Sequence, residues 1–173
     1  MRIRTAAAAA LLLAFAAARA LDAQTPVRFS AAAALALPIG DLGDAADIGF
    51  NLGLRGEGRL GRPGWSLRGD LSWDHFGGKG FVDSYSYLGV AGNLLHRSAG
   101  SRAYQFGGLG LYNSKTAFLD RLNEDQTNLG MQLGVGLDFK PGDVNTFLEF
   151  GLMNVFTSGG NSLWFPLRFG VRF

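Results

Sequence analysis

The last thirteen residues, NSLWFPLRFGVRF (161–173), are the most informative stretch of this 173-residue chain. Every second residue from Leu163 to Phe173 is apolar, and the positions between them include Arg168 and Arg172. A period of two residues with one continuous apolar face indicates a β-strand and not a helix. Chain ends are usually polar and loosely held. An apolar final strand that ends on an aromatic residue therefore needs a special environment.

The same alternation recurs along the chain and predicts an all-β fold of eight strands. Connections between these segments are alternately long and short, which favours an antiparallel up-and-down order. In 85–96 both faces are nearly equally apolar, and we expect Leu88, Val90 and Leu94 to face outward. The facing of 102–113 stays open. The predicted strands are 26–37, 50–60, 65–73, 85–96, 102–113, 129–139, 145–156 and 163–173.

Residues 1–23 have the layout of a secretory signal peptide. The basic stretch MRIR precedes an apolar run at 6–18, and the small residues of ARALDA follow. This run is too short to span a membrane and stay there. We therefore expect cleavage after Ala20 or Ala23 and a single domain over residues 24–173.

Charge and cysteine content exclude several classes of protein. The chain has 16 basic and 14 acidic residues, but its first 23 residues hold three arginines and one aspartate, which leaves 13 of each sign. The pI of about 9.2 therefore gives no support for nucleic-acid binding. The absence of cysteine excludes a disulfide framework and zinc–thiolate sites.

The positions of the aromatic residues indicate that the apolar face of the strands contacts lipid and does not pack in a protein core. Trp65 and Trp73 share one face eight residues apart, which is roughly 26 Å along a strand. Strand tilt reduces this to about 20 Å, close to the apolar band of a membrane barrel. We expect membrane-girdle aromatics at Trp65, Trp73, Phe50, Phe139 and Phe156. A secreted soluble barrel of the lipocalin kind is the alternative.

The opposite face carries charges of both signs. Eight strands enclose an interior just wide enough for side chains, where an isolated ion is very costly. We therefore expect a transmembrane barrel with a polar lumen filled by side chains, and Glu149 beside an arginine such as Arg168. The inward Pro166 predicts a local break or bulge. The expected lumen charge network is Arg55, Glu57, Arg59, Arg68, Asp70, Asp138, Glu149, Arg168 and Arg172.

The unpaired backbone edges of the first and last strands also favour a closed barrel in lipid. Such edges aggregate in water, whereas lipid tolerates no unpaired backbone. The last strand should therefore close against the first.

These features resemble the small outer-membrane β-barrel domain family, whose relatives include the eight-stranded X, W and A type outer-membrane proteins. The resembling stretches are the signal peptide, LPIGDLGD (37–44), YQFGGLGLYNS (104–114) and FPLRFGVRF (165–173). The resemblance implies the cell outer membrane, with its lipid and lipopolysaccharide as surroundings. It also implies both termini in the periplasm, and we expect a monomer. The barrel-assembly machinery would read the terminal signature Phe165, Leu167, Phe169, Val171 and Phe173.

Some relatives modify lipid A, so the two histidines need attention. His96-Arg97-Ser98 has the His-x-Ser spacing of outer-membrane lipid A deacylases, but it lies in a predicted short turn with no glutamate placed to orient the histidine. Asp74-His75, near Ser84 and Ser86, could supply a base and a nucleophile. Neither spacing is diagnostic, so we expect no catalytic site.

Glycine and aspartate patterns add no cofactor or metal site. The G-x-G runs at 108–110 and 134–136 lack the strand–loop–helix context of a dinucleotide site, and we expect them to leave room for lumen arginines. Asp41, Asp44 and Asp47 do not match an EF-hand. The expected function is structural or loop-mediated surface interaction. A narrow pore for small or apolar solutes and a lipid A-modifying enzyme are the alternatives.

Overall fold

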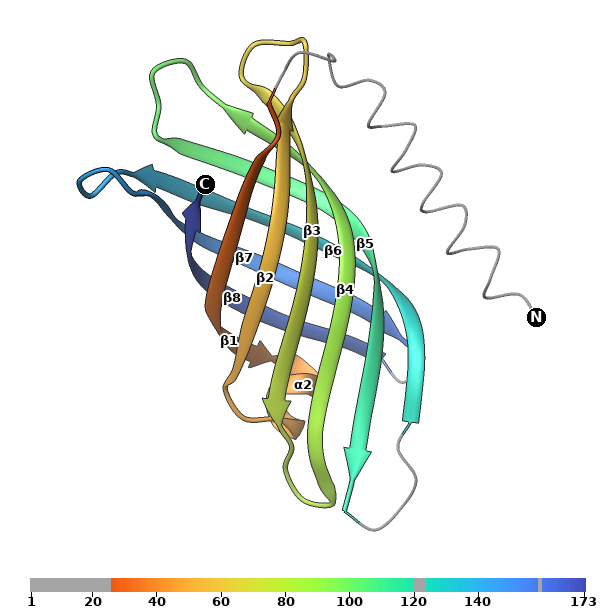
Figure 1. The fold of residues 1–173 in the computed structure, drawn as a ribbon. Helices are drawn as coiled ribbons and strands as arrows, with labels where there is room; N and C mark the ends of the chain where they lie inside the picture. Colours follow the sequence, from red (N-terminus) through yellow and green to blue (C-terminus); the bar gives the residue numbers. More distant parts are fainter. Residues whose placement is uncertain (1–25, 120–123, 159) are drawn as a thin grey trace.

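In the computed structural model, which describes residues 26–119, 124–158 and 160–173, the chain forms one closed barrel (Figure 1). Each strand pairs antiparallel with the next, and the last pairs with the first. A six-residue helix, α2 (Gly40–Ala45), follows the first strand. The strands are β1 (Arg28–Ile39), β2 (Gly49–Arg59), β3 (Trp65–Gly77), β4 (Val82–Arg97), β5 (Ala103–Phe118), β6 (Glu124–Phe139), β7 (Asn145–Thr157) and β8 (Gly160–Arg172).

The prediction of an eight-stranded up-and-down barrel is confirmed. Strands β3 to β6 are longer than predicted, and residues 40–45 form a helix where a plain connection was expected. Gly40 has a φ of +58°, which favours glycine at the sharp turn from β1 into α2. No helix among the described residues is long and apolar enough to cross a membrane. The predicted signal peptide lies outside the described residues.

The two ends of the barrel differ (Figure 1). One end, called here the turn end, carries the short β2–β3, β4–β5 and β6–β7 connections, the start of β1 and Phe173. The opposite end, the loop end, carries α2 and the β3–β4 connection.

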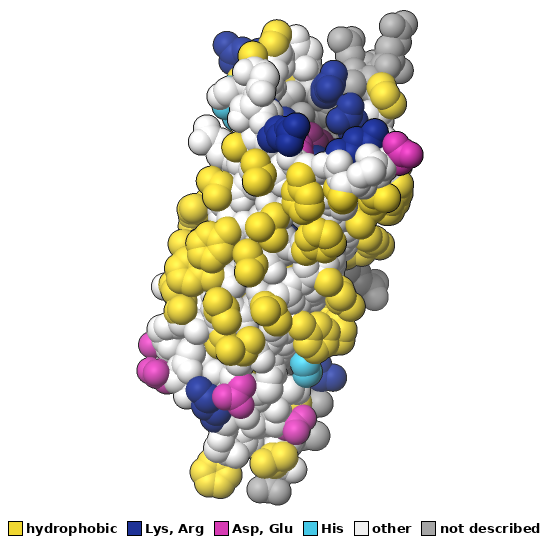
Figure 2. Space-filling model, turned by 90° about the vertical axis from the view of Figure 1, so that its left-hand side faces the viewer, with side chains coloured by type: hydrophobic (Ala, Val, Ile, Leu, Met, Phe, Trp, Pro, Cys, Tyr) yellow, Lys and Arg dark blue, Asp and Glu magenta, His cyan; other side chains and the backbone are white. Residues whose placement is uncertain are grey.

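On the face seen in Figure 2, apolar side chains form a belt between the two ends, and every strand contributes exposed apolar residues to the outside of the barrel. Leu88, Val90 and Leu94 are exposed in this belt, which confirms their predicted outward facing. In β5, whose facing the sequence left open, Tyr104 and Tyr112 are buried inside the barrel and Leu109 is exposed.

Closure of the barrel follows the apolar row of the final strand. β8 pairs with β1 in one unbroken register from Ser30↔Arg172 to Ile39↔Leu163, and Pro166 lies opposite Ala36 within it. Towards β7, the ladder between described residues has no pairs at Phe165 and Pro166, and the register is the same on both sides of the gap. Proline lacks the N–H that a ladder needs. The expected local break is present, but it is an interruption and not a bulge.

Candidate functional site: the lumen and the two ends of the barrel

The middle of the lumen holds a buried cluster of ion pairs, called here the central cluster: Arg55, Arg68, Asp70, Glu149 and Arg168. Glu149 is fully buried, with its Oε1 2.7 Å from Arg68 Nη1 and its Oε2 2.9 Å from Arg55 Nη1. Arg68 Nε also lies 2.7 Å from Asp70 Oδ1. Arg168 lies farther away, with Nη1 4.0 Å from Glu149 Oε2. The nearest partners of Glu149 are therefore Arg68 and Arg55, while Arg168, suggested by the sequence, is a more distant one.

Neutral and aromatic groups complete this cluster. The Tyr104 hydroxyl donates a hydrogen bond of 2.7 Å to Glu149 Oε1. The guanidinium of Arg68 lies over the Phe106 ring at 4.6 Å, and that of Arg55 over Phe147 at 5.1 Å. Arginine stacks favourably on aromatic faces when it is removed from water. The cluster therefore fills the barrel cross-section with paired charges and rings.

A second ion-pair group, the rim group, lies nearer the turn end: Glu57, Arg97, Asp138 and Arg172. Arg97 donates two hydrogen bonds to Glu57, of 2.6 and 3.2 Å. Asp138 lies between two arginines, with Oδ1 2.5 Å from Arg172 Nη1 and Oδ2 3.5 Å from Arg97 Nε. Arg172 Nη2 also donates to the Tyr104 hydroxyl at 3.2 Å, which joins this group to the central cluster.

Arg59 is the exception among the predicted lumen charges. It is the last residue of β2, its side chain is exposed at the turn end, and the structure gives it no ion pair with any described residue. The alternation places Arg59 on the lumen side, but the barrel wall ends there. Its assignment to the lumen network is wrong for this reason.

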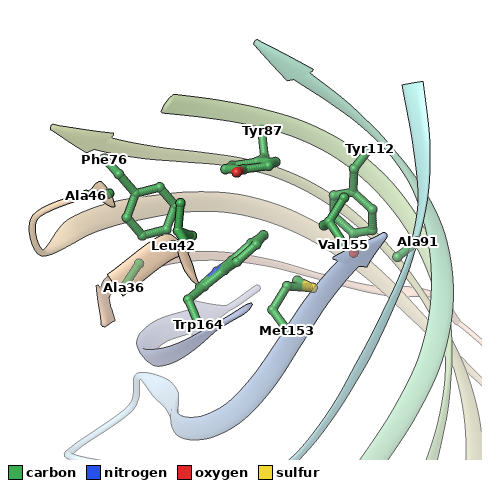
Figure 3. Packing of buried hydrophobic residues seen from close by; sticks show 10 residues of the cluster. All are labelled: Ala36, Leu42, Ala46, Phe76, Tyr87, Ala91, Tyr112, Met153, Val155 and Trp164. Atoms are coloured by element: carbon green, nitrogen blue, oxygen red, sulfur yellow. The ribbon is translucent and has the colours of Figure 1, made fainter. Parts of the chain in front are cut away.

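The loop-end half of the lumen is closed by apolar and aromatic side chains, called here the loop-end plug (Figure 3). The Trp164 and Tyr87 ring centroids are 5.0 Å apart, and Phe76 meets Trp164 edge-on at 5.6 Å. Trp164 Nε1 donates to the buried Asp74 at 3.1 Å. The plug consists of Ala36, Leu42, Ala46, Phe76, Tyr87, Ala91, Tyr112, Met153, Val155 and Trp164.

Of the two G-x-G runs expected to leave room for lumen arginines, 134–136 makes room for aromatic rings instead, whereas Gly108 and Gly110 lie against Asn93 and Ala91. A Cβ atom at Gly136 would overlap the ring of Tyr104, and one at Gly134 would overlap that of Phe106. Gly89 and Gly130 leave space for Tyr112 in the same way. Interiors are packed at high density, so each large ring needs a neighbour without a side chain.

His75 and Ser86 form the one serine–histidine contact among the hydrogen bonds of the described residues. His75 Nδ1 lies 2.9 Å from Ser86 Oγ on the outer face of the barrel. Asp74 points the other way, is fully buried and accepts from Trp164. His75 otherwise contacts the Phe50 and Trp73 rings. Among the residues that the structure describes, no carboxylate is bonded to this pair as the third group that orients a catalytic histidine.

The structure also shows where the other candidate groups lie, namely the His96 motif and the three loop aspartates. His96 packs against the Trp65 ring with centroids 4.7 Å apart, while Arg97 of the same motif faces inward to Glu57. Within the described ranges, no three His, Asp or Glu side chains are close enough together to hold a metal ion. This statement covers Asp41, Asp44 and Asp47 of the loop end.

The predicted girdle residues lie on the outer face in two groups. Phe50 and Trp73 meet edge-on at 5.3 Å towards the loop end, where Phe156 is also exposed. Trp65 lies at the turn end of β3, and Phe139, the last residue of β6, packs on Phe169 with centroids 6.0 Å apart. The terminal signature residues Phe165, Leu167, Phe169 and Val171 also face outward, and Phe173 follows them with 76% of its surface exposed.

Reasoning from the sequence missed the loop-end plug. The strand pattern alone assigns no role to Phe76, Tyr87, Tyr112 or Trp164, which the structure brings together in the plug. The available signal was the weak alternation in 85–96 and 102–113, because a strand with two apolar faces must bury the second face too.

Comparisons with known proteins agree with this geometry. A family model described as "Outer membrane protein beta-barrel domain" matches residues 7–173. No match was found among curated proteins.

Solved structures share the fold at low sequence identity. Neisserial surface protein A superposes with a TM-score of 0.58 at 19% identity, over 84% of this chain and 95% of that one. Ail of Yersinia pestis gives 0.55 at 18% identity, over 86% and 100%. The N-terminal barrel of Pseudomonas aeruginosa OprF gives 0.52 at 14% identity, over 87% and 100%.

Proposed function

Because the chain belongs to the outer membrane protein β-barrel domain family, we propose that it acts in the outer membrane through its surfaces, either structurally or by loop-mediated contact. The observation that carries this proposal is the filled lumen. From the turn end inward, the rim group, the central cluster and the loop-end plug follow one another, each made of buried or half-buried side chains. This arrangement leaves the ends and the outer face of the barrel for function.

The filled lumen argues against the pore alternative. Glu149 is fully buried and Arg68 is 2% exposed, as expected where water has no open path. Opening such a path would separate the ion pairs that cross the barrel and leave buried charges without partners, which is strongly unfavourable.

The negative charge of the loop end indicates what kind of partner would bind there. Its described residues carry Asp41, Asp44, Asp47, Asp83, Glu124 and Asp125 against Lys79 and Lys115. A hollow of about 320 Å³ lies among them, lined by Asp41 and Glu124 together with tyrosine, serine and threonine hydroxyls. One Ail structure was solved in complex with sucrose octasulfate, a heparin analogue. An acidic loop end suits the opposite ligand chemistry, so we infer a partner surface that is cationic or rich in hydroxyl groups.

Planar-bilayer conductance tests the closed lumen. We expect the purified barrel to give no stepwise conductance at concentrations at which a porin control opens channels. Reproducible channels from the folded protein would overturn the proposal and favour the pore.

Surface labelling tests the orientation. The chain has no cysteine, so Lys79→Cys at the loop end and Ser98→Cys at the turn end each create a unique thiol. Whole cells treated with a membrane-impermeant maleimide should label Lys79→Cys and leave Ser98→Cys unlabelled until the cells are lysed. The reverse pattern would place the loop end in the periplasm and end the proposal of loop-mediated surface contact.

A further inference from the structure

The turn end carries a surplus of positive charge (Figure 2). Arg97 and Arg172 are neutralised by Glu57 and Asp138 in the rim group, and Lys140 lies 3.9 Å from Asp143. Four further arginines are exposed, and the structure gives none of them an ion pair with another described residue. These are Arg28, Arg59, Arg62 and Arg102.

The unpaired arginines line two adjoining hollows. One, of about 470 Å³, lies among Arg28, Arg102, Lys140 and Arg172 and is bordered by Phe139 and Phe173. The other, of about 480 Å³, lies among Arg28, Arg59, Arg62 and Arg97 and is bordered by Trp65. Arg28 lines both. Each hollow therefore combines several guanidinium groups with an aromatic edge, and the carboxylate in each, Asp138 or Glu57, is already paired in the rim group.

The position of these hollows at the edge of the apolar belt indicates which kind of anion would bind there. Trp65 and Phe139 are at the edge of the apolar belt, where aromatic residues mark the boundary between acyl chains and headgroups. The arginines lie at the strand ends and turns beyond these aromatic residues, so in a membrane-embedded barrel they would be at the depth of lipid phosphates. Guanidinium groups bind phosphate oxygens with paired hydrogen bonds, while the aromatic edges suit the glycerol and upper acyl carbons of the same lipid.

We propose that the turn end is a binding surface for anionic phospholipid, and that Arg28, Arg59, Arg62 and Arg102 hold the lipid phosphates. The surface contacts whichever leaflet meets the turn end. In the orientation proposed above, this is the periplasmic leaflet. The inference requires a membrane-embedded barrel, but neither the loop-mediated function nor the orientation.

The test counts lipids bound to the purified barrel in neutral detergent, by native mass spectrometry during titration with phosphatidylglycerol or phosphatidylcholine. We expect phosphatidylglycerol to bind more tightly. The Arg28→Gln/Arg102→Gln variant should weaken phosphatidylglycerol binding by about fivefold for each arginine, the factor that matches about 1 kcal/mol per cation at an anionic surface. Binding of phosphatidylcholine should not change.

A matched control removes the same charge from the other end. Lys79→Gln/Lys115→Gln should leave phosphatidylglycerol binding as in the wild type. Equal binding of the two lipids, or an equal loss in the loop-end control, would overturn the proposal. Binding of glycerol 1-phosphate as tight as that of the lipid would assign the hollows to a soluble phosphate instead. Conductance and cysteine labelling report on the proposed function separately, so failure of either proposal is distinguishable.

Discussion

Arg68 and Glu149 are 81 residues apart in sequence, yet their side chains meet at 2.7 Å in the middle of the barrel. Arg68 belongs to β3 and Glu149 to β7, and these strands are four places apart in a ring of eight, on opposite sides. The contact therefore spans the lumen and joins the two walls. Because the partners are buried, each carries a large desolvation penalty, which the opposite charges of the cluster, the Tyr104 hydroxyl and the Phe106 ring offset.

Glu149→Ala should destabilise the barrel strongly. Its removal leaves Arg55 and Arg68 with Asp70 as their one close carboxylate in the described part of the chain, and an uncompensated buried charge costs about 3–5 kcal/mol in the free energy of unfolding. The measurement is urea unfolding followed by the mobility difference between unboiled and boiled samples. Glu124→Ala, at an exposed position, is the control and should stay within about 0.5 kcal/mol of the wild type. Wild-type stability of Glu149→Ala would show that the cluster does not hold the walls together.

Gly89→Ala should destabilise the barrel through a single methyl group. Its Cβ atom would overlap the Tyr112 ring, which the loop-end plug holds in place. Overpacking of this kind costs about 1–3 kcal/mol. Gly92→Ala in the same strand is the control, because its Cβ atom would meet nothing within 4 Å. Equal urea midpoints for the two variants would contradict the packing argument.

The strand pattern was predictable because a barrel wall imposes a local rule: each residue faces either lipid or lumen. The alternating rows from Leu129 to Phe139 and from Leu163 to Phe173 follow that rule, so their facing can be read from each strand alone, before its neighbouring strands are known. The pairing partners could not be read in this way. The register places Arg168 directly opposite Glu149 on the next strand, yet Arg68 from the opposite wall is nearer, because the side chains extend across the lumen.

Two of the differences, at Arg59 and at Trp164, share one physical cause: alternation gives the direction of a side chain but not its height in the barrel. Arg59 has the lumen direction but lies where the wall ends, so it is exposed. Trp164 has the same direction at a deeper level, and there it packs on Tyr87 and Phe76. Helix α2 was missed because six residues are too few to show a helical period.

Expression of the protein should leave lipid A unmodified. His75 and Ser86 are in contact, but the neighbouring carboxylate of Asp74 is on the opposite face of β3 and is bound to Trp164. Mass spectra of lipid A from cells with and without the protein should be identical. A mass change corresponding to loss or gain of an acyl chain, abolished by Ser86→Ala and by His75→Ala, would establish an enzyme instead.

Phe173→Ala should impair assembly in cells more than stability in vitro. The Phe173 side chain is 76% exposed, so its removal takes away little packing, and the backbone N–H that donates to the Phe29 carbonyl at 3.0 Å is kept. By contrast, a terminal aromatic read by the assembly machinery acts before the barrel closes. We expect a reduced heat-modifiable band in the outer-membrane fraction, together with a urea midpoint near that of the wild type after refolding in detergent. Phe29→Ala, which removes an exposed ring from β1 at the same end (57% exposed, against 76% for Phe173), should leave assembly unchanged. A parallel loss in both variants would mean that apolar surface at the turn end matters, and not the identity of the last residue.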